Sequence, residues 1–108
     1  MFKRCESPVV GLLILEIKIH GAKSLKDRRQ VVRSLVTILR RRWNVSVSDL
    51  GPLDSWSDAI MAIGVIGSSF DSVEDLLSEV SQFLTIKEDL AEFSIVRMKR
   101  EVEKHDIF

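Results

Sequence analysis

The residues best suited to chemistry in this sequence are the lysines and arginines between positions 23 and 42. This segment holds eight basic residues and a single acid, Asp27, so its net charge is +7. The segment from Asp49 to Glu92 is the opposite, with ten acids, one lysine and a net charge of −9. The 108-residue chain as a whole has a formal net charge of zero. That average conceals a strongly polarised distribution of charge.

Several of these basic residues repeat at helical spacing. At 3.6 residues per turn, an arc of about 60° holds Lys26, Arg29, Arg33 and Arg40. Such a row of charged donors matches the phosphates of a nucleic-acid backbone. The predicted nucleic-acid-binding residues are this row and its flanking cations: Lys23, Lys26, Arg29, Arg33, Arg40, Arg41 and Arg42. Two alternatives stay open, namely a solvated helix face with arginines near the helix C-terminus, and a docking site for an acidic protein.

Arg28 differs from its basic neighbours because its helical angle places it on the apolar side. We expect its aliphatic part to cover the edge of the core. We also expect its guanidinium to pair with a carboxylate such as Glu16.

Patterns for catalysis or metal binding are missing from the sequence. The two histidines and the lone cysteine have no metal-ligand spacing, no serine has a nucleophile-elbow context, and the five glycines form no phosphate loop. We therefore expect no catalytic residue, metal, cofactor or small-molecule substrate. A single cysteine fits a reducing cytosol, and the apolar run 9–15 is too short to span a membrane. The prediction is a cytoplasmic protein that is not an enzyme.

Hydrophobic periodicity predicts six elements that would position these side chains. Helices are expected from Ser24 to about Arg42, with Ser24 as the N-cap, and from about Asp71 to Thr85. Strands are expected over 9–20, 43–50, 56–66 and about 92–101. The order β-α-β-β-α-β with right-handed crossovers predicts the α+β class, as a ferredoxin-like sandwich with a four-stranded antiparallel sheet and both helices on one face. One domain is expected over residues 9–102, with tails at 1–8 and 103–108.

The sheet face opposite the helices is a second candidate surface. If odd-numbered strand residues face the helices, half of the other face is apolar, and a large exposed apolar patch marks an interface. The alternative function is thus a protein-interaction module that forms a homodimer through Val10, Leu12, Ile14, Trp56, Ile60 and Ile66. A register shift of one residue would exchange the two faces, so the sequence leaves open which face is uncovered.

Residues 21–35, with the sequence GAKSLKDRRQVVRSL, resemble the hallmark of the YlxP-like family, small bacterial proteins of unknown function. Residues 44–50, Trp56 and residues 62–67 are similar to the middle section of that family. The resemblance covers about Val9 to Val102. The chain departs from the pattern at residues 51–53, which are more polar in relatives, and in its basic N-terminal tail.

The resemblance implies a ferredoxin-like fold and, because family genes often lie near those for ribosome maturation and translation initiation, a role with RNA. We therefore expect a non-catalytic protein that binds structured RNA or a ribosomal particle through the basic edge of its first helix. Acylphosphatases share this fold and bind phosphate in the loop after the first strand. A minor alternative is a similar phosphohydrolase that uses the loop from His20 to Ser24 and Asn44.

Overall fold

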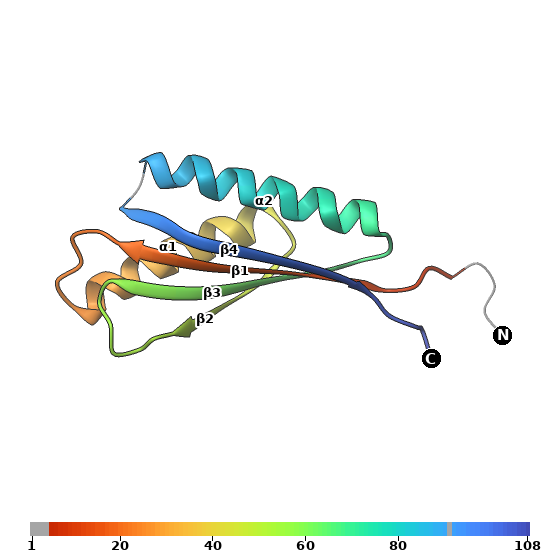
Figure 1. Ribbon diagram of the computed structural model, residues 1–108, viewed down its shortest axis with the longest axis horizontal. Coiled ribbons are helices and arrows are strands. Elements are labelled where there is room, and N and C mark those ends of the chain that lie inside the picture. The colour runs from red at the N-terminus through yellow and green to blue at the C-terminus, as the bar shows by residue number, and fades with distance from the viewer. Residues whose placement is uncertain (1–4, 91) are drawn as a thin grey trace.

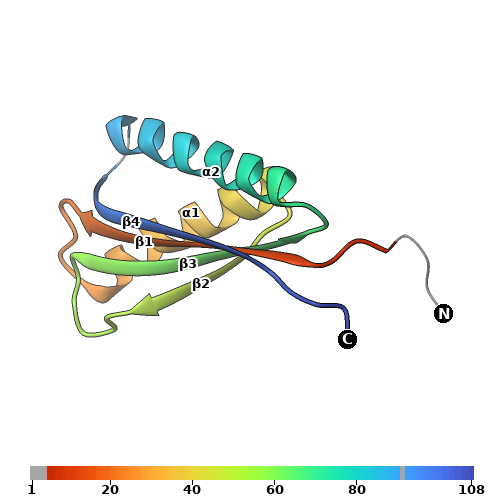
Figure 2. The same ribbon diagram turned by 45° about the vertical axis from the view of Figure 1, so that its right-hand side comes forward.

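The computed structural model describes residues 5–90 and 92–108, and it contains the six predicted elements in the predicted order (Figure 1). They are β1 (Val9–Ile19), α1 (Leu25–Arg42), β2 (Ser46–Gly51), β3 (Asp58–Gly67), α2 (Phe70–Leu90) and β4 (Phe93–Lys104). The strands form one antiparallel sheet in the order β2-β3-β1-β4. Both helices lie on the same side of this sheet (Figures 1 and 2). The predicted α+β ferredoxin-like sandwich is confirmed. Lys3 and Arg4 of the basic tail lie outside the described residues.

The N-terminus of α1 is closed by its own side chains. The hydroxyl of Ser24 accepts a hydrogen bond from the Asp27 amide at 3.1 Å, and the Asp27 carboxylate accepts one from the Lys23 amide at 2.9 Å. This reciprocal pattern satisfies two backbone donors that a helix otherwise leaves without partners. The helix ends at Trp43, whose extended backbone donates its N–H to the Leu39 carbonyl at 3.0 Å.

The core lies between the sheet and the two helices. Odd-numbered residues of β1 and β3, apart from Gly67 at the end of β3, are buried, as the alternation of a half-covered sheet requires. They pack against apolar side chains of both helices: Val32, Leu35 and Leu39 from α1, and Val73, Leu77, Val80 and Leu84 from α2. The even-numbered residues of β1 and β3 therefore lie on the open face, which settles the question of register that the sequence left open.

Gly11 lets α2 approach β1 closely. A Cβ atom at this position would lie 2.5 Å from Cγ1 of Val73 and 2.9 Å from Cδ1 of Leu77. We expect Gly11→Ala to lower the free energy of unfolding by about 1–3 kcal/mol, because overpacking a filled core displaces its neighbours. Gly64→Ala is the matched control, since its Cβ would meet only the Gly11 carbonyl oxygen at 3.9 Å. Urea denaturation of both variants checks this prediction, and equal stability of the two would contradict it.

The observed bounds differ from the predicted ones where apolar periodicity carries little information. Trp43 caps α1 and packs edge-on against Phe83 of α2 at 5.4 Å between ring centroids, so β2 begins at Ser46. The last turn of α2 includes Lys87, Glu88 and Leu90, which have high helix propensity, and does not continue the apolar stripe. β4 continues to Lys104, because it stays paired with β1 as far as Val9.

Candidate nucleic-acid interface

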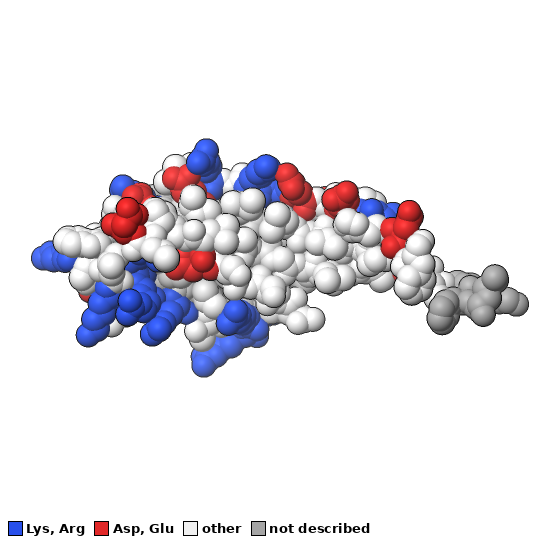
Figure 3. All heavy atoms as spheres, turned by 90° about the horizontal axis from the view of Figure 1, so that it is seen from below, with Lys and Arg blue, Asp and Glu red and all other residues white. Residues whose placement is uncertain are grey.

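The basic residues predicted on the first helix lie together on the exposed surface of α1 and the residues beside it. We call this set the α1 basic stripe, which comprises Lys23, Lys26, Arg29, Arg33, Arg40, Arg41 and Arg42, all exposed. From Lys26 to Arg40 the stripe runs about 21 Å along the helix at 1.5 Å per residue. Figure 3 shows Lys and Arg side chains gathered at the lower left of the molecule, whereas basic and acidic groups alternate along the upper edge.

Carboxylates of the same chain do not neutralise the stripe. In the part of the chain that the structure describes, every ion pair involves basic residues outside the stripe. In the acidic segment, Glu79 of α2 accepts a hydrogen bond from the Trp43 indole at 3.2 Å. The positive charges of the stripe therefore have no ion-paired partner among the described residues.

Two arginines of the stripe are held in place by neutral partners. Arg40 donates from Nη2 to the Val47 carbonyl of edge strand β2 at 3.1 Å. The guanidinium of Arg42 lies over the rings of Trp43 and Phe83, at 5.0 and 4.6 Å from their centroids. These contacts restrict the side chains of Arg40 and Arg42, and both guanidinium groups keep their positive charge. The C-terminal end of the stripe is thus partly preorganised.

Arg28 is a structural residue and does not belong to the stripe. It is only 4% exposed. Its guanidinium makes a two-pronged ion pair with Asp49 of β2, at 2.8 Å for Nη1–Oδ2 and 2.9 Å for Nη2–Oδ1. Its Nε also donates to the Asp58 carbonyl at 2.8 Å. The predicted partner Glu16 was wrong: Glu16 lies on the open face and pairs with Arg97 at 2.5 Å.

The sequence did not identify Asp49 because β2 is irregular at this point. The pairing of β2 with β3 shifts between Asp49 and Gly51, so simple alternation does not place the Asp49 side chain. The Asp49 carboxylate also accepts the Gly51 amide at 2.9 Å. Together, Arg28 and Asp49 join the start of α1 to the end of β2.

The Arg28–Asp49 pair gives the fold an acid-sensitive contact. Hydrogen bonds from Arg28 and then from the Gly51 amide lower the pKa of the Asp49 carboxyl, and the same pair raises the pKa of Arg28. A carboxyl whose pKa is lower in the folded state binds its proton more readily when unfolded. Its contribution to stability is thus present above the unfolded value of about 3.9 and is lost as the pH falls through the folded value.

We therefore expect the free energy of unfolding to fall as the pH drops below about 4. In the Asp49→Asn variant, the protein should be less stable at neutral pH, and its stability should depend less on pH in the acid range. Urea denaturation of both proteins at a series of pH values measures this. Parallel pH profiles for the two proteins would contradict the assigned role of Asp49.

The loop before α1 and Asn44 are not brought together. Both ends of the loop are already engaged, since the His20 amide donates to the Glu92 carbonyl and the Lys23 amide donates to the Asp27 carboxylate. The nearby arginine, Arg28, is occupied by Asp49. Asn44 follows the other end of α1, and an 18-residue helix is about 27 Å long. The structure therefore does not assemble the loop, an arginine and an asparagine into one site.

The open sheet face carries most of the predicted apolar patch. Val10, Leu12, Ile14, Ile60 and Ile66 lie on it at even positions of β1 and β3, and Ile66 is the most exposed of them at 73%. The placement of Trp56 was wrong, because β3 begins only at Asp58. Trp56 lies in the preceding loop and is 51% exposed. The open face therefore has no aromatic side chain on β1 or β3.

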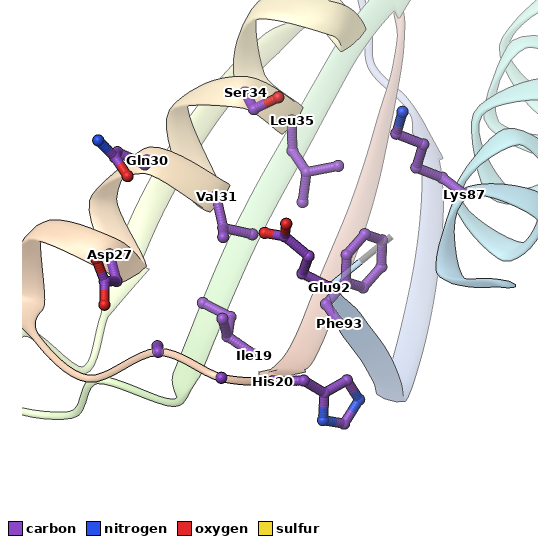
Figure 4. Close-up of a pocket in the computed structure, with 12 residues that line it drawn as sticks. Ile19, His20, Asp27, Gln30, Val31, Ser34, Leu35, Lys87, Glu92 and Phe93 are labelled. Atoms are coloured by element: carbon purple, nitrogen blue, oxygen red, sulfur yellow. The ribbon is translucent and has the colours of Figure 1, made fainter. Parts of the chain in front are cut away.

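A hollow of about 660 Å³ lies between the two helices at the end of the sheet where β1 ends and β4 begins (Figure 4). Its lining includes Asp27, Gln30, Lys87 and Glu92. The ring of His20 points away from it in Figure 4 and shares a 2.5 Å hydrogen bond with Ser94. Among the described residues, no three His, Cys, Asp or Glu side chains are grouped so as to hold a metal ion. The residues that line the hollow do not form a grouping that indicates a particular ligand.

Comparisons with known proteins relate this chain to others of unassigned function. The family described as "Protein of unknown function (DUF503)" matches residues 10–100. The chain is also similar to the "Uncharacterized protein YlxP" of Bacillus subtilis (strain 168), with 32% identity over 76 residues that cover 70% of this chain and 83% of the relative. Over the described residues, neither helix is long and apolar enough to cross a membrane.

Proposed function

The chain belongs to the DUF503 family of proteins of unknown function, and we propose that it binds structured RNA or a ribosomal particle through the α1 basic stripe. The family assignment confirms the YlxP-like resemblance seen in the sequence. The observation that carries the proposal is the presence of seven exposed cations on α1 and beside it, four of them on one arc of the helix, with no ion pair to a described carboxylate. A polyanion supplies the counter-charge that no described carboxylate supplies through an ion pair.

The geometry favours recognition of charge and shape over recognition of bases. Sequence-specific sheets that bind single-stranded RNA stack bases on aromatic side chains of their central strands. Here the central strands β1 and β3 present aliphatic residues, glycine and the charged residues Glu16, Lys18 and Asp58 on the open face, and no aromatic residue. The stripe, in contrast, offers repeated charged donors along about 21 Å of helix. We therefore assign the phosphate contacts to the stripe and no base contacts to the sheet.

The dependence of binding on salt tests this proposal. If about five of the seven cations contact phosphates, the plot of log affinity against log salt has a slope of roughly −3.5 to −4.5. A labelled RNA hairpin of mixed sequence, titrated by filter binding at several salt concentrations, gives this slope. An affinity that does not change with salt would contradict the proposal.

Sedimentation tests whether the protein binds a ribosomal particle. We expect the protein to co-sediment with ribosomal particles in low salt and to leave them in high salt, since counterion release drives the contact. Treatment with nuclease before sedimentation should release it. Capture that survives nuclease would contradict the RNA contact and instead favour an acidic protein docked on the same stripe.

A further inference from the structure

The outer edge of β4 carries a row of backbone groups that pair with no other described strand. β4 is the last strand of the sheet, and among the described residues it pairs only with β1. The amide of His105 donates to the Pro8 carbonyl at 2.8 Å, which shows that odd-numbered residues of this stretch turn their backbone groups toward β1. By antiparallel alternation, the even-numbered residues turn theirs outward: Met98, Arg100, Val102 and Lys104. Such an edge is a template for another strand.

The uncovered part of the β4 edge begins after Ile95. The pairing of β4 with β1 is irregular between Glu16 and Ile17. Near this point the outward amide of Ile95 donates to the carboxylate of Glu88 from α2. The backbone edge is therefore covered by α2 as far as Ile95. The uncovered part is the stretch 97–104, which is long enough to pair with a strand of ordinary length.

The charged side chains along this part of β4 change sign from one end to the other. Arg97, Lys99, Glu101 and Glu103 alternate onto the open face, so the positive charges come first along the strand and the negative charges last. Within one chain, Nζ of Lys99 lies 3.1 Å from Oε1 of Glu101, and both side chains are largely exposed. A strand with this order is complementary to itself when it runs antiparallel, as a two-fold axis requires.

We propose that a second copy of this chain pairs antiparallel with β4, with the two-fold axis passing through Arg100. Outward backbone groups sit on even-numbered residues, so even positions must pair with even positions. In the register that pairs Arg100 with its own copy, Arg97 lies opposite Glu103 and Lys99 lies opposite Glu101. All these cross-strand pairs join opposite charges, whereas the neighbouring allowed registers place Lys99 against Lys99 or Glu101 against Glu101.

The residue on the axis does not oppose this pairing. Arg100 projects to the helix side of the sheet, where its guanidinium donates to Glu74 at 3.0 Å and to Ser78 at 3.1 Å. Its charge is thus neutralised by α2 of its own chain. Pairing of the two β4 edges would join the sheets into one of eight strands and place the two open faces, with their apolar patches, side by side. This inference does not depend on the function proposed for the α1 basic stripe.

Charge reversal with charge exchange tests the proposal. We expect the wild-type protein to be a dimer by analytical ultracentrifugation at high micromolar concentration. Lys99→Glu should weaken the dimer about tenfold or more, which corresponds to about 1.4 kcal/mol. The double variant Lys99→Glu/Glu101→Lys should restore it, because the exchange re-creates opposite pairs. Lys87→Glu, a reversal on α2, is the matched control and should leave the dimer unchanged.

Disulfide trapping tests the register. In a Cys5→Ser background, Lys99→Cys and Glu101→Cys variants mixed under oxidation should form a heterodimer, while each variant alone should not. The reason is that residues 99 and 101 face each other only in the proposed register, at a Cα separation that permits a disulfide. Three results would overturn the proposal: a monomeric wild type, a dimer that Lys99→Glu does not weaken, or efficient disulfide trapping of either cysteine variant with itself. The second outcome would place the contact on the open face instead.

Discussion

Reversing two charges in the α1 basic stripe, in the variant Arg29→Glu/Arg33→Glu, is expected to weaken RNA binding on the order of 100-fold at 0.1 M salt. Each phosphate contact releases about 0.7–0.9 of a counterion, so each lost contact lowers affinity roughly five- to eightfold at this salt. The introduced carboxylates add repulsion. Both arginines are exposed and have no hydrogen-bonded partner among the described residues, so the fold should not change.

The matched control is Lys87→Glu/Lys104→Glu, which alters the net charge by the same amount on exposed or half-exposed positions away from α1. We expect this control to bind the RNA hairpin within about threefold of wild type, because long-range charge effects are screened over about 10 Å in 0.1 M salt. The slope against log salt should also be shallower by about 1.4–1.8 in the stripe variant alone. Equal loss of affinity in both variants would show that net charge, and not the stripe, governs binding.

Removal of the Arg28 side chain should have the largest effect on stability. We expect Arg28→Ala to lower the free energy of unfolding by about 3 kcal/mol, since loss of one partner leaves the other without compensation. The substitution removes both contacts to Asp49 and the bond from Nε to the Asp58 carbonyl. Arg33→Ala, an exposed arginine on the same helix, is the control and should stay within about 0.5 kcal/mol of wild type.

A double-mutant cycle separates the ion pair from the packing of the arginine stem. The loss in Asp49→Ala/Arg28→Ala should be clearly smaller than the sum of the two single losses, because residues in direct contact are coupled. Urea denaturation at neutral pH supplies the four stabilities. Additive losses would mean that the two side chains act independently and that Arg28 contributes only by packing.

The sequence predicted the fold because its elements carry independent and consistent signals. Leu13, Leu15 and Ile17 alternate with half-exposed residues, and Ser24 with Asp27 marks the start of α1. The second helix was underestimated because Lys87 and Glu88 interrupt the apolar stripe although both have high helix propensity. Trp56 was misplaced because aromatic residues are common in strands, and only the pairing pattern shows that β3 begins at Asp58.

Of the candidate site, the sequence supplied the members of the stripe but not their partners. Helical spacing alone placed the four residues from Lys26 to Arg40 on one arc. The contacts of Arg40 with the Val47 carbonyl and of Arg28 with Asp49 are long-range, and no local pattern encodes them. The same limit applies to the β4 edge, since its charge order is visible in the sequence but its outward backbone groups follow only from pairing with β1.

The most direct measurement is a ¹H–¹⁵N NMR titration of the labelled protein with the RNA hairpin in low salt. The account predicts that amide and arginine side-chain signals of the α1 basic stripe shift in proportion to bound RNA and return when salt is raised. Signals of Leu12, Ile14 and Ile60 on the open face should stay in place. Shifts confined to these open-face residues, with the stripe unmoved, would contradict it.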